Sequence, residues 1–299
     1  EGSHAVEHGA VVLATGAGES KIYDWGFRVH KSVLTHQELE QRVWDGVLDL
    51  NNVNCVAMIQ CWRYHEEEMG YCSRVCCNQA LKNALELKRR KPSMQVVIFY
   101  RDMMSYGFNE QYYTEARRQG VHFVRFEMDE HPKMRMEEGK AIVSAWDPIL
   151  QRPVEVHADI LSVASGIEPN DNAELLELFG VENDEFGFFK EAEIKWRPVD
   201  FMKQGVFSCG MARGPANMDE SILSAKAAAQ RAIRVLRERQ LVSGSVVAEV
   251  RHSLCSLCGR CIEVCPYGAR SLSQEMDKVL VDAVVRQGCG ACAAVCPNS

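Results

Sequence analysis

Short continuous apolar runs alternate with amphipathic segments along most of the chain. The runs predict strands covered on both faces: residues 9–16, 53–61, 95–101, 121–126, 158–166 and 205–210. The segments between them predict helices: residues 35–48, the segment through Ala80 to Lys91, and residues 110–119, 171–180 and 218–240. Residues 132–157 predict an antiparallel excursion with polar turns. Alternating strands and helices are typical of a parallel α/β domain.

Local signals mark the ends of several of these elements. Thr35 and Glu38 form a capping-box pair, which predicts that a helix begins there. Pro92 follows the next predicted helix and stops it, because proline cannot continue the hydrogen-bond ladder. Several strands end in small residues and glycine. For residues 14–16 the simplest interpretation is a strand-to-turn junction.

Composition narrows the class of protein. The chain has 299 residues, of which 46% are hydrophobic and 25% charged, as in an ordinary soluble globular protein with a sizeable core. The net charge is −7 without a basic block, which argues against a nucleic-acid partner. No apolar run approaches the roughly 18 residues needed to span a membrane. The 13 cysteines are odd in number and clustered, so we expect a reducing cytoplasm and metal ligation rather than disulfides.

The C-terminal tail carries cysteines at the spacing of iron–sulfur ligands. A first run has the bacterial ferredoxin pattern C-x2-C-x2-C-x3-C-P: Cys255, Cys258, Cys261, Cys265 and Pro266. A second run supplies most of another copy: Cys289, Cys292, Cys296 and Pro297. In paired runs, the first three cysteines of one run share a cubane cluster with the last cysteine of the other. We therefore predict one complete 4Fe–4S cluster with these ligands: Cys255, Cys258, Cys261 and Cys296.

The second cluster of the tail is predicted to lack one ligand. Arg286 stands where the second run should begin with cysteine, which leaves Cys265, Cys289 and Cys292. A guanidinium is effectively never deprotonated, so Arg286 cannot replace a thiolate. Three states are open: a three-iron cluster, a four-iron cluster with water or another group on one iron, or no cluster. We favour an occupied but altered cluster with a raised reduction potential, because net charge helps to set that potential.

Zinc is the rival interpretation of the tail, since paired C-x2-C units also form zinc ribbons. Three ligands in one tight run, with a fourth directly before a proline, favour an iron–sulfur cluster instead. Soft, charged thiolates also suit such clusters.

A further group of cysteines lies between a predicted strand and a predicted helix: Cys61, Cys72, Cys76 and Cys77. Adjacent cysteines rarely form a disulfide with each other without strain, so neighbouring thiols indicate metal. No two of these cysteines have C-x-x-C spacing, which disfavours a thioredoxin-type redox disulfide. We predict a third cluster here, with buried free thiols at a helix start as the alternative. Cys55 lies within an apolar run and is expected to pack in the core.

Several short motifs are similar to those of thioredoxin-reductase-like flavoproteins. The resemblance implies that FAD contacts these residues: Ala14, Thr15, Gly16, Gly166, Gly210, Met218, Asp219, Glu220 and Ser221. A helix that begins near Met218 would also point its free N–H groups and positive dipole end at an anionic group. With the motif from Cys72 to Cys77 and the ferredoxin tail, essentially the whole chain resembles the A subunit of heterodisulfide reductase.

This resemblance implies thioredoxin-reductase-like dinucleotide-binding domains and a C-terminal bacterial-type ferredoxin domain. The implied division is residues 1–52 as the first part of the flavin domain, 53–152 as an inserted α/β domain with the cysteine group, 153–245 as the second part of the flavin domain, and 246–299 as the ferredoxin domain. The sequence departs from the family at two further points. The G-x-G-x-x-G fingerprint is absent and is expected upstream of residue 1, and Trp62 stands where a small residue is expected.

Members of the family carry electrons, and some split pairs of electrons at the flavin. We therefore predict an oxidoreductase: an electron-transfer subunit of a cytoplasmic heterodisulfide-reductase-like complex. Its partners would be other subunits and electron donor and acceptor proteins. One alternative is a nicotinamide-dependent flavin oxidoreductase with a ferredoxin tail, which would need a glycine-rich loop after residue 59, where the sequence has Gln60, Cys61 and Trp62. Another is a non-catalytic scaffold that holds clusters.

Overall fold

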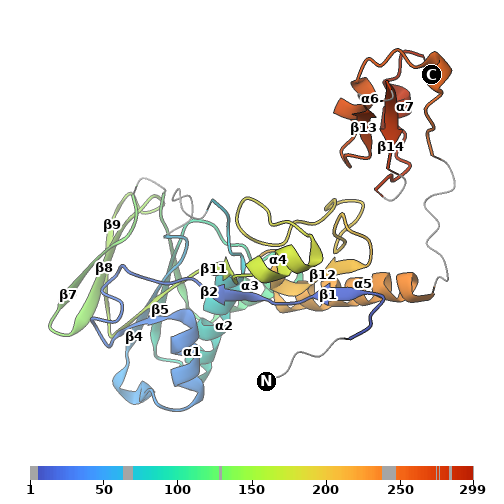
Figure 1. The fold of residues 1–299 in the computed structure, drawn as a ribbon. Coiled ribbons are helices and arrows are strands. Elements are labelled where there is room, and N and C mark those ends of the chain that lie inside the picture. The colour runs from blue at the N-terminus through green and yellow to red at the C-terminus, as the bar shows by residue number, and fades with distance from the viewer. Residues whose placement is uncertain are drawn as a thin grey trace.

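The computed structural model describes residues 6–62, 70–127, 130–237, 247–273, 275, 277–282 and 285–298. Within these ranges the chain forms an α/β body, followed in sequence by a small C-terminal unit (Figure 1). The predicted α/β class is confirmed. No helix in the described ranges is both long and apolar enough to cross a bilayer.

A five-stranded parallel sheet forms the centre of the body, in the order β3-β10-β4-β5-β6. Its strands are β3 (Val33–Thr35), β10 (Ile160–Val163), β4 (Cys55–Ile59), β5 (Gln95–Tyr100) and β6 (His122–Arg125). Every residue of β4 and β10 is buried, as expected for strands whose sheet is covered on both faces. The continuous apolar runs therefore predicted β4, β5, β6 and β10 correctly, whereas β3 was not predicted.

Three helices cover one face of the central sheet. They are α1 (His36–Trp44), α2 (Val75–Arg90) and α3 (Glu110–Arg118). Side chains alternate along a strand, so Val56 and Met58 of β4 pack together with the apolar residues of these helices. The predicted end of the second helix is confirmed, because α2 stops shortly before a proline.

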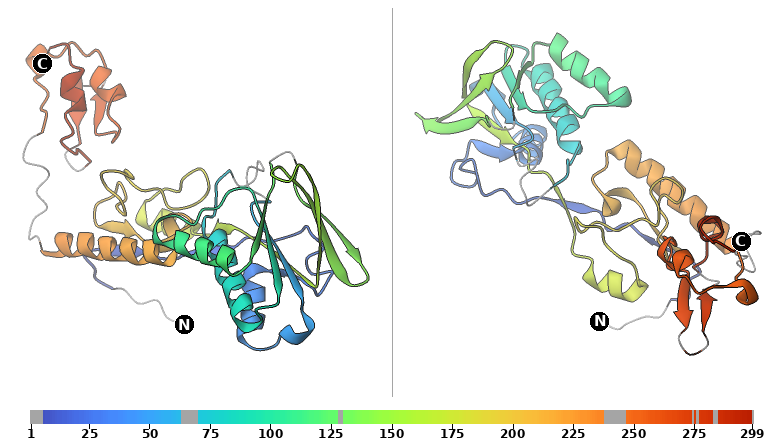
Figure 2. Two further views of the ribbon diagram at one scale, coloured as in Figure 1. Left: turned by 180° about the vertical axis from the view of Figure 1, so that it is seen from behind. Right: turned by 90° about the horizontal axis from the view of Figure 1, so that it is seen from above.

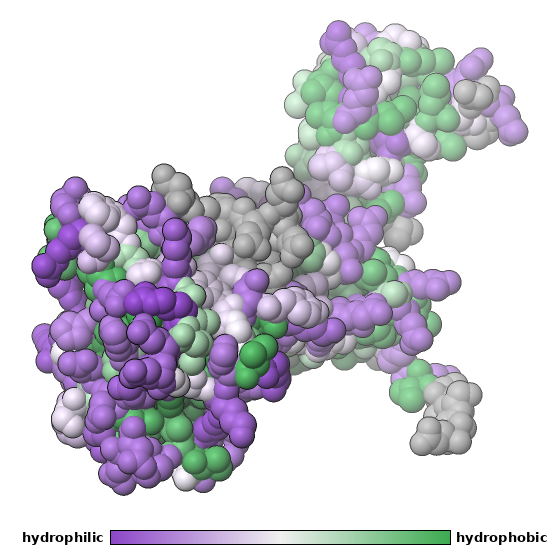
Figure 3. Space-filling view, turned by 90° about the vertical axis from the view of Figure 1, so that its left-hand side faces the viewer, coloured by the Kyte–Doolittle hydropathy of each residue, from purple (hydrophilic) through white to green (hydrophobic). Residues whose placement is uncertain are grey.

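An antiparallel sheet covers the opposite face. Ala57 and Ile59 of β4 pack with the apolar side of β7 (Lys133–Glu137), β8 (Lys140–Asp147) and β9 (Arg152–Ala158). This is the predicted antiparallel excursion. Exposed and half-buried residues alternate along β7 and β9, as expected for a sheet with one solvated face. The surface at this end of the molecule is mostly hydrophilic (Figure 3).

Helix α1 begins at the predicted capping box and ends earlier than predicted. The Glu38 N–H donates to Thr35 Oγ1 at 3.1 Å, and the Thr35 N–H donates to the Glu38 carboxylate at 3.2 Å. The last helical residue is Trp44, whereas the sequence predicted a helix to about residue 48. Gly46 has a φ of +68°, a left-handed conformation that glycine adopts without steric cost and that commonly ends a helix.

A buried histidine joins α1 to the central sheet. His36 is 1% exposed, and its Nδ1 lies 2.6 Å from Ser162 Oγ on β10. The side-chain amide of Gln60 contacts the His36 Nε2, and Asn83 of α2 donates to the His36 carbonyl at 2.8 Å. Burial lowers the pKa of His36 from 6.5 to about 4, and the hydrogen bond with Gln60 opposes this shift. The ring is therefore neutral at pH 7.

We expect His36 to make the free energy of unfolding fall as the pH drops below 6.5. The unfolded chain takes up a proton on this ring near pH 6.5, whereas the folded chain does so only near pH 4. The stabilisation is therefore complete above the unfolded pKa and is lost progressively toward pH 4, by up to about 3 kcal/mol. Urea unfolding at neutral and mildly acidic pH measures this loss. His36→Gln should flatten the pH dependence and the exposed His122→Gln should not; an unchanged slope in His36→Gln contradicts the prediction.

A second region of the body combines short strands with a long helix (Figure 2). Strand β1 (Val11–Leu13) pairs in parallel with β12 (Val206–Ser208), and β2 (Ala17–Glu19) pairs antiparallel with β11 (Ile167–Pro169). Helix α5 (Met218–Arg237) packs on β1 and β12. The predicted strand at residues 9–16 is thus shorter than expected. Short helices connect these regions: η1 (Leu50–Asn52), η2 (Gly107–Asn109), α4 (Ala173–Phe179) and η3 (Gly210–Arg213).

The central sheet joins strands from all three of the predicted segments of the body. Strand β3 precedes the predicted boundary at residue 52, and β10 follows the predicted boundary at residue 152. Strand β10 nevertheless lies between β3 and β4 and pairs with both. The division of the chain into a two-part flavin domain and an inserted domain stays a prediction.

The C-terminal unit consists of a β-hairpin and short helices. Its elements are η4 (His252–Leu254), α6 (Arg260–Glu263), β13 (Arg270–Ser273), β14 (Lys278–Val281) and α7 (Ala291–Ala294). Strands β13 and β14 pair antiparallel, and α6 lies against α7. Gly259 and Gly290, both with positive φ, directly precede α6 and α7, so the two cysteine runs adopt similar turns. Residues 238–246, which lie between α5 and this unit in the sequence, are outside the described residues.

Candidate functional site

Four cysteines gather where β4 ends and α2 begins. Cys61 follows β4, Cys76 and Cys77 lie in the first turn of α2, and Cys72 lies in the loop before it. The Sγ atoms of Cys61 and Cys77 each lie 3.7 Å from the carbonyl oxygen of Asp102, which follows β5. The Cys76 thiol is hydrogen-bonded to Cys77. The parallel sheet explains this meeting, because the carboxyl ends of neighbouring strands share one edge.

Burial and mutual charge control the ionisation of these thiols. Burial raises the pKa of Cys61 to about 11 and also raises the pKa of Cys72. The hydrogen bond to Cys77 and burial raise the pKa of Cys76, and negative charge on the other three adds to this shift. The same hydrogen bond lowers the pKa of Cys77. Four thiolates would repel each other here, so they need a positive centre of the kind that a metal cluster supplies.

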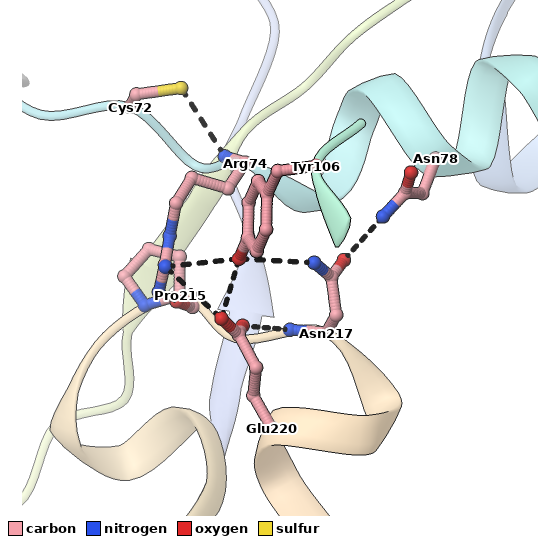
Figure 4. Close-up of polar contacts among 7 residues, drawn as sticks. All are labelled: Cys72, Arg74, Asn78, Tyr106, Pro215, Asn217 and Glu220. Atoms are coloured by element: carbon pink, nitrogen blue, oxygen red, sulfur yellow. Dashed lines mark hydrogen bonds and ion pairs between the residues drawn. The ribbon is translucent and has the colours of Figure 1, made fainter. Parts of the chain in front are cut away.

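Backbone N–H groups point at two of the sulfur atoms. The Met104 N–H donates to Cys77 Sγ at 3.4 Å, and the Arg74 N–H donates to Cys72 Sγ at 3.4 Å (Figure 4). Hydrogen bonds to sulfur favour the thiolate over the thiol and tune the potentials of iron–sulfur clusters. These contacts therefore suit cysteines that ligate a cluster.

A cavity of about 460 Å³ lies beside the start of α2. Its lining includes Gly166, one of the residues that the resemblance assigned to FAD. It also includes Ala17 and Met211, which adjoin two more such residues, Gly16 and Gly210. The three glycine-ended motifs, which lie far apart in the sequence, therefore converge on one cavity.

The cysteine group borders this same cavity through Cys76. Asn78, close to Cys76 on α2, also lines it, and its side-chain N–H donates to Asn217 Oδ1 at 2.9 Å. The Asn78 Oδ1 is buried and has no hydrogen-bond partner among the described residues. A buried acceptor without a donor costs free energy, so a hydroxyl or N–H of a bound group would offset this cost. Lys82 adds a cation to the lining.

Hydrogen bonds tie the cysteine loops to the strand end that carries the Gly166 motif. The Trp62 indole N–H donates to the Ala164 carbonyl at 2.6 Å, and the Tyr71 hydroxyl donates to the Ile167 carbonyl at 2.6 Å. The Ile167 N–H donates in turn to Ser73 Oγ at 2.9 Å. Sequence reasoning missed these residues and treated Trp62 only as a departure from the family. The signal was the presence of aromatic residues directly beside the cysteines.

The connection between β1 and β2 holds three of the predicted FAD residues. Ala14 and Thr15 are exposed, and the Thr15 carbonyl accepts a hydrogen bond from Asn170 at 2.8 Å. Gly16 has a φ of +72°, and a side chain there would meet no atom within 4 Å. This turn leads directly into the residues that line the cavity.

The start of α5, also predicted to contact FAD, does not line this cavity. The predicted residues here are Met218, Asp219, Glu220 and Ser221. Met218 is 74% exposed, and the Ser221 N–H donates to the Asn217 carbonyl at 2.9 Å. The Glu220 carboxylate accepts from the Asn217 N–H at 2.8 Å and from the Tyr106 hydroxyl (Figure 4). Gly210 also bonds to α5, through its N–H and the hydroxyl of Ser224.

In the C-terminal unit, cysteines of both runs line one cavity of about 310 Å³. They are Cys255, Cys258, Cys261, Cys292 and Cys296. The cavity thus contains all four ligands predicted for the complete cluster, which the fold brings together from the two ends of the unit. Cys265 and Cys289, predicted for the second cluster, lie outside this lining.

Arg286 occupies the position in the second run where the ferredoxin pattern has a cysteine. Arg286 is half-buried, and its Nε has no hydrogen-bond partner among the described residues. Within those residues, no three His, Cys, Asp or Glu side chains are arranged to hold a single metal ion. A cubane of four irons holds its thiolates farther apart than one ion does, so a cluster requires a wider arrangement of sulfur atoms than a single-ion site.

Comparison with known proteins identifies relatives of the chain. Residues 248–271 match the family described as "4Fe-4S binding domain". A protein of Archaeoglobus profundus that is described as like the A subunit of heterodisulfide reductase is 32% identical over 90% of this chain and 38% of its own length. An iron-sulfur A subunit of CoB–CoM heterodisulfide reductase from Methanopyrus kandleri is 33% identical over 92% of this chain and 44% of its own length.

Among solved structures, thioredoxin reductase of T. acidophilum is similar with a TM-score of 0.48 and 15% identity, over 76% of this chain and 64% of that protein. The chain spans about four-tenths of the length of the relatives from A. profundus and M. kandleri. The two alignments extend over about nine-tenths of this chain. Over that length, the chain is similar to A subunits of heterodisulfide reductase.

Proposed function

We propose that the chain is an electron-carrying part of a heterodisulfide-reductase-like A subunit, an oxidoreductase that relays electrons between FAD and iron–sulfur clusters. The observation that carries the proposal is the position of Cys76. It belongs to the group of four cysteines and also lines the cavity on which the predicted flavin motifs converge. A flavin exchanges electrons in pairs or singly and a cluster exchanges them singly, so a shared border between the two sites suits electron transfer.

The residues of the cavity fit a flavin in three respects. Gly166 and the turn at Gly16 leave space close to the backbone. Asn78 offers a buried acceptor that needs a donor, and Lys82 offers a cation that is ion-paired with Glu40 at 2.5 Å. A reduced flavin carries negative charge, which a nearby cation stabilises. The part of the flavin site that would hold the diphosphate is not assigned to any residue of this chain, since its fingerprint is absent from the sequence.

The cysteines are proposed as ligands in three groups. One cluster would be bound in the body by Cys61, Cys72, Cys76 and Cys77. A second would be bound in the tail, in the crossed arrangement that the 310 Å³ cavity supports: Cys255, Cys258, Cys261 and Cys296. A third, altered cluster would be bound by Cys265, Cys289 and Cys292. The partners we propose are other subunits of such a complex and the proteins that donate and accept its electrons; a cytoplasmic location stays a prediction.

Cofactor analysis of the full chain, purified without oxygen, tests the proposed function. We expect bound flavin together with iron and sulfide, and stepwise reduction should bleach the flavin absorbance and produce cluster EPR signals. A chain that holds clusters but no flavin under added FAD would support the scaffold alternative. Bleaching by NADH or NADPH alone, without any partner protein, would support the nicotinamide-dependent alternative.

Asn78→Leu is expected to weaken FAD binding about tenfold. The substitution removes the buried acceptor that a flavin donor would occupy, and one such hydrogen bond contributes roughly 1 kcal/mol or more when the alternative is an unpaired buried group. Flavin fluorescence during titration of the flavin-depleted chain measures the affinity. Asn183→Leu is the matched control, because the Asn183 Oδ1 is also buried without a partner among the described residues but does not line the cavity. Equal affinities in the two variants would contradict the role of Asn78.

A further inference from the structure

Arg74 adopts a backbone conformation that is rare for arginine. Its φ is 55° and its ψ is −37°, so a long side chain occupies a region that glycine normally favours. In this conformation the Arg74 N–H reaches Cys72 Sγ at 3.4 Å. Strain of this kind persists only where surrounding contacts hold it in place. The contacts of the Arg74 side chain identify what holds it.

The Arg74 guanidinium spans the space between the cysteine loop and the start of α5 (Figure 4). Its Nη1 lies 3.3 Å from Glu220 Oε1 and 3.2 Å from the Tyr106 hydroxyl, and its Nη2 donates to the Pro215 carbonyl. Tyr106 also donates to Glu220, and the Asn217 N–H caps the other carboxylate oxygen. A single residue thus contacts a predicted cluster ligand through its backbone and an ion-paired network through its side chain.

The ion pair between Arg74 and Glu220 contributes little to the stability of the fold. The side chains of Arg74 and Glu220 are 36% and 34% exposed, and partly exposed pairs of this kind contribute little to folding. Arg74 nevertheless contacts the cysteine group directly, because its N–H donates to Cys72 Sγ. Arg74 lies two residues after Cys72, so the guanidinium belongs to the same loop as the Cys72 sulfur.

We propose that Arg74 and Glu220 together set the reduction potential of the cluster bound by Cys61, Cys72, Cys76 and Cys77. This inference rests on the proposed function, which places a cluster on these cysteines. Arg74 is a positioning residue: its N–H orients the Cys72 sulfur, and its positive charge favours the electron that the cluster accepts. Glu220 fixes the guanidinium and opposes its effect with a negative charge. The pair thereby adjusts how readily electrons move between the cluster and the flavin proposed to occupy the neighbouring cavity.

The two members of the pair should shift the potential in opposite directions. Reduction adds one negative charge to a cluster, so Arg74→Gln should make reduction harder and Glu220→Gln should make it easier. We expect each change to be on the order of tenfold in the ratio of reduced to oxidised cluster at a fixed potential, which corresponds to about 59 mV for one electron. Arg74→Lys keeps the charge and should lie close to the wild type. A purely structural disturbance would not produce shifts of opposite sign.

An EPR-monitored redox titration of the full chain with reconstituted clusters tests this inference. Cys77→Ser first identifies the signal of the cluster in the body. Arg89→Gln is the matched control. Arg89 is also ion-paired with a glutamate, Glu86, but it lies at the C-terminal end of α2, whereas Cys76 and Cys77 lie at the start of that helix. Opposite shifts in Arg74→Gln and Glu220→Gln, with no shift in Arg89→Gln, are the expected result.

The possible failures are distinguishable. If Cys77→Ser removes no iron and no signal, the cluster in the body is wrong, and both the proposed function and this inference fall. If the cluster is present but Arg74→Gln and Glu220→Gln leave its potential unchanged, or move it in the same direction, the inference is overturned while the proposed function stands. Equal iron content in the Arg74, Glu220 and Arg89 variants shows that a measured shift reflects the potential rather than loss of the cluster.

Discussion

Cys77→Ser in the full chain is expected to lower the iron content by one cluster, about four irons per chain. Cys77 is the thiol of this group whose pKa is lowered, and it accepts hydrogen bonds from Cys76 and from the Met104 N–H. It is also almost fully buried, so a serine there would offer a poor ligand with little access to water. Iron and sulfide analysis after anaerobic purification, together with EPR, measures the loss.

Cys55→Ser is the control for this prediction. Cys55 is also buried, but it lies in the core of β4 and outside the group of four. Its replacement should destabilise the fold, because a hydroxyl enters an apolar environment, and should leave the iron content of the folded chain unchanged. Full iron content in Cys77→Ser would show that the four cysteines are free thiols rather than ligands.

Arg286→Cys is expected to convert the second cluster of the tail into an ordinary four-cysteine cluster. The substitution supplies the thiolate that the ferredoxin pattern lacks and removes a cation whose Nε is buried without a partner among the described residues. Both changes make the surroundings of the cluster more negative, so its reduction potential should fall. Iron content should rise if the native site holds three irons or none. Anaerobic EPR of the wild type and the variant side by side measures both effects.

Cys258→Ala separates the two clusters of the tail. Cys258 lines the 310 Å³ cavity with the other ligands proposed for the complete cluster, so Cys258→Ala should remove that cluster. The EPR signal of the second cluster of the tail, which Arg286→Cys is expected to change, should remain. If the wild type already shows two ordinary four-cysteine clusters in the tail, the ligand count derived from the sequence is wrong.

Strands β4, β5, β6 and β10 could be predicted because their apolar runs have a physical cause. Strand β4 sends Val56 and Met58 to the helices and Ala57 and Ile59 to the antiparallel sheet. Both faces therefore demand apolar residues, and the run is continuous rather than alternating. The capping box at Thr35 and Glu38 is equally local. Signals that depend only on residues close together along the chain can be recognised from a single sequence.

The order of the strands was not visible in the sequence, because pairing depends on contacts between distant segments. Strand β10 follows β9 in the chain but is inserted between β3 and β4, and no local pattern specifies that position. The end of α1 was missed for a different reason. Apolar residues continue to Leu48, and only the left-handed conformation at Gly46 ends the helix before them.

The grouping of the cysteines was visible in the sequence, and their role as cluster ligands stays a prediction. Cysteine spacing identified the two groups of thiols, because cluster ligation imposes short, regular intervals. The residues that hold the cysteine loops in place had no such signature: Trp62 and Tyr71 reach the Gly166 strand end, and Arg74 reaches Glu220. Each of these contacts joins residues about a hundred positions apart or more. The Glu220 carboxylate takes part in the ion-paired network, and its predicted contact with a flavin stays a prediction.

The two hydrogen bonds at Ile167 have a consequence for damage by oxygen. Its carbonyl and N–H are both held by the loop around Cys72, through Tyr71 and Ser73, so opening of this loop breaks both hydrogen bonds and leaves β11 held by its pairing with β2. A chain that loses the cluster in its body should therefore exchange the Ile167 amide hydrogen faster. It should also loosen the strand end that borders the cavity, so that oxidative loss of iron is followed by release of flavin.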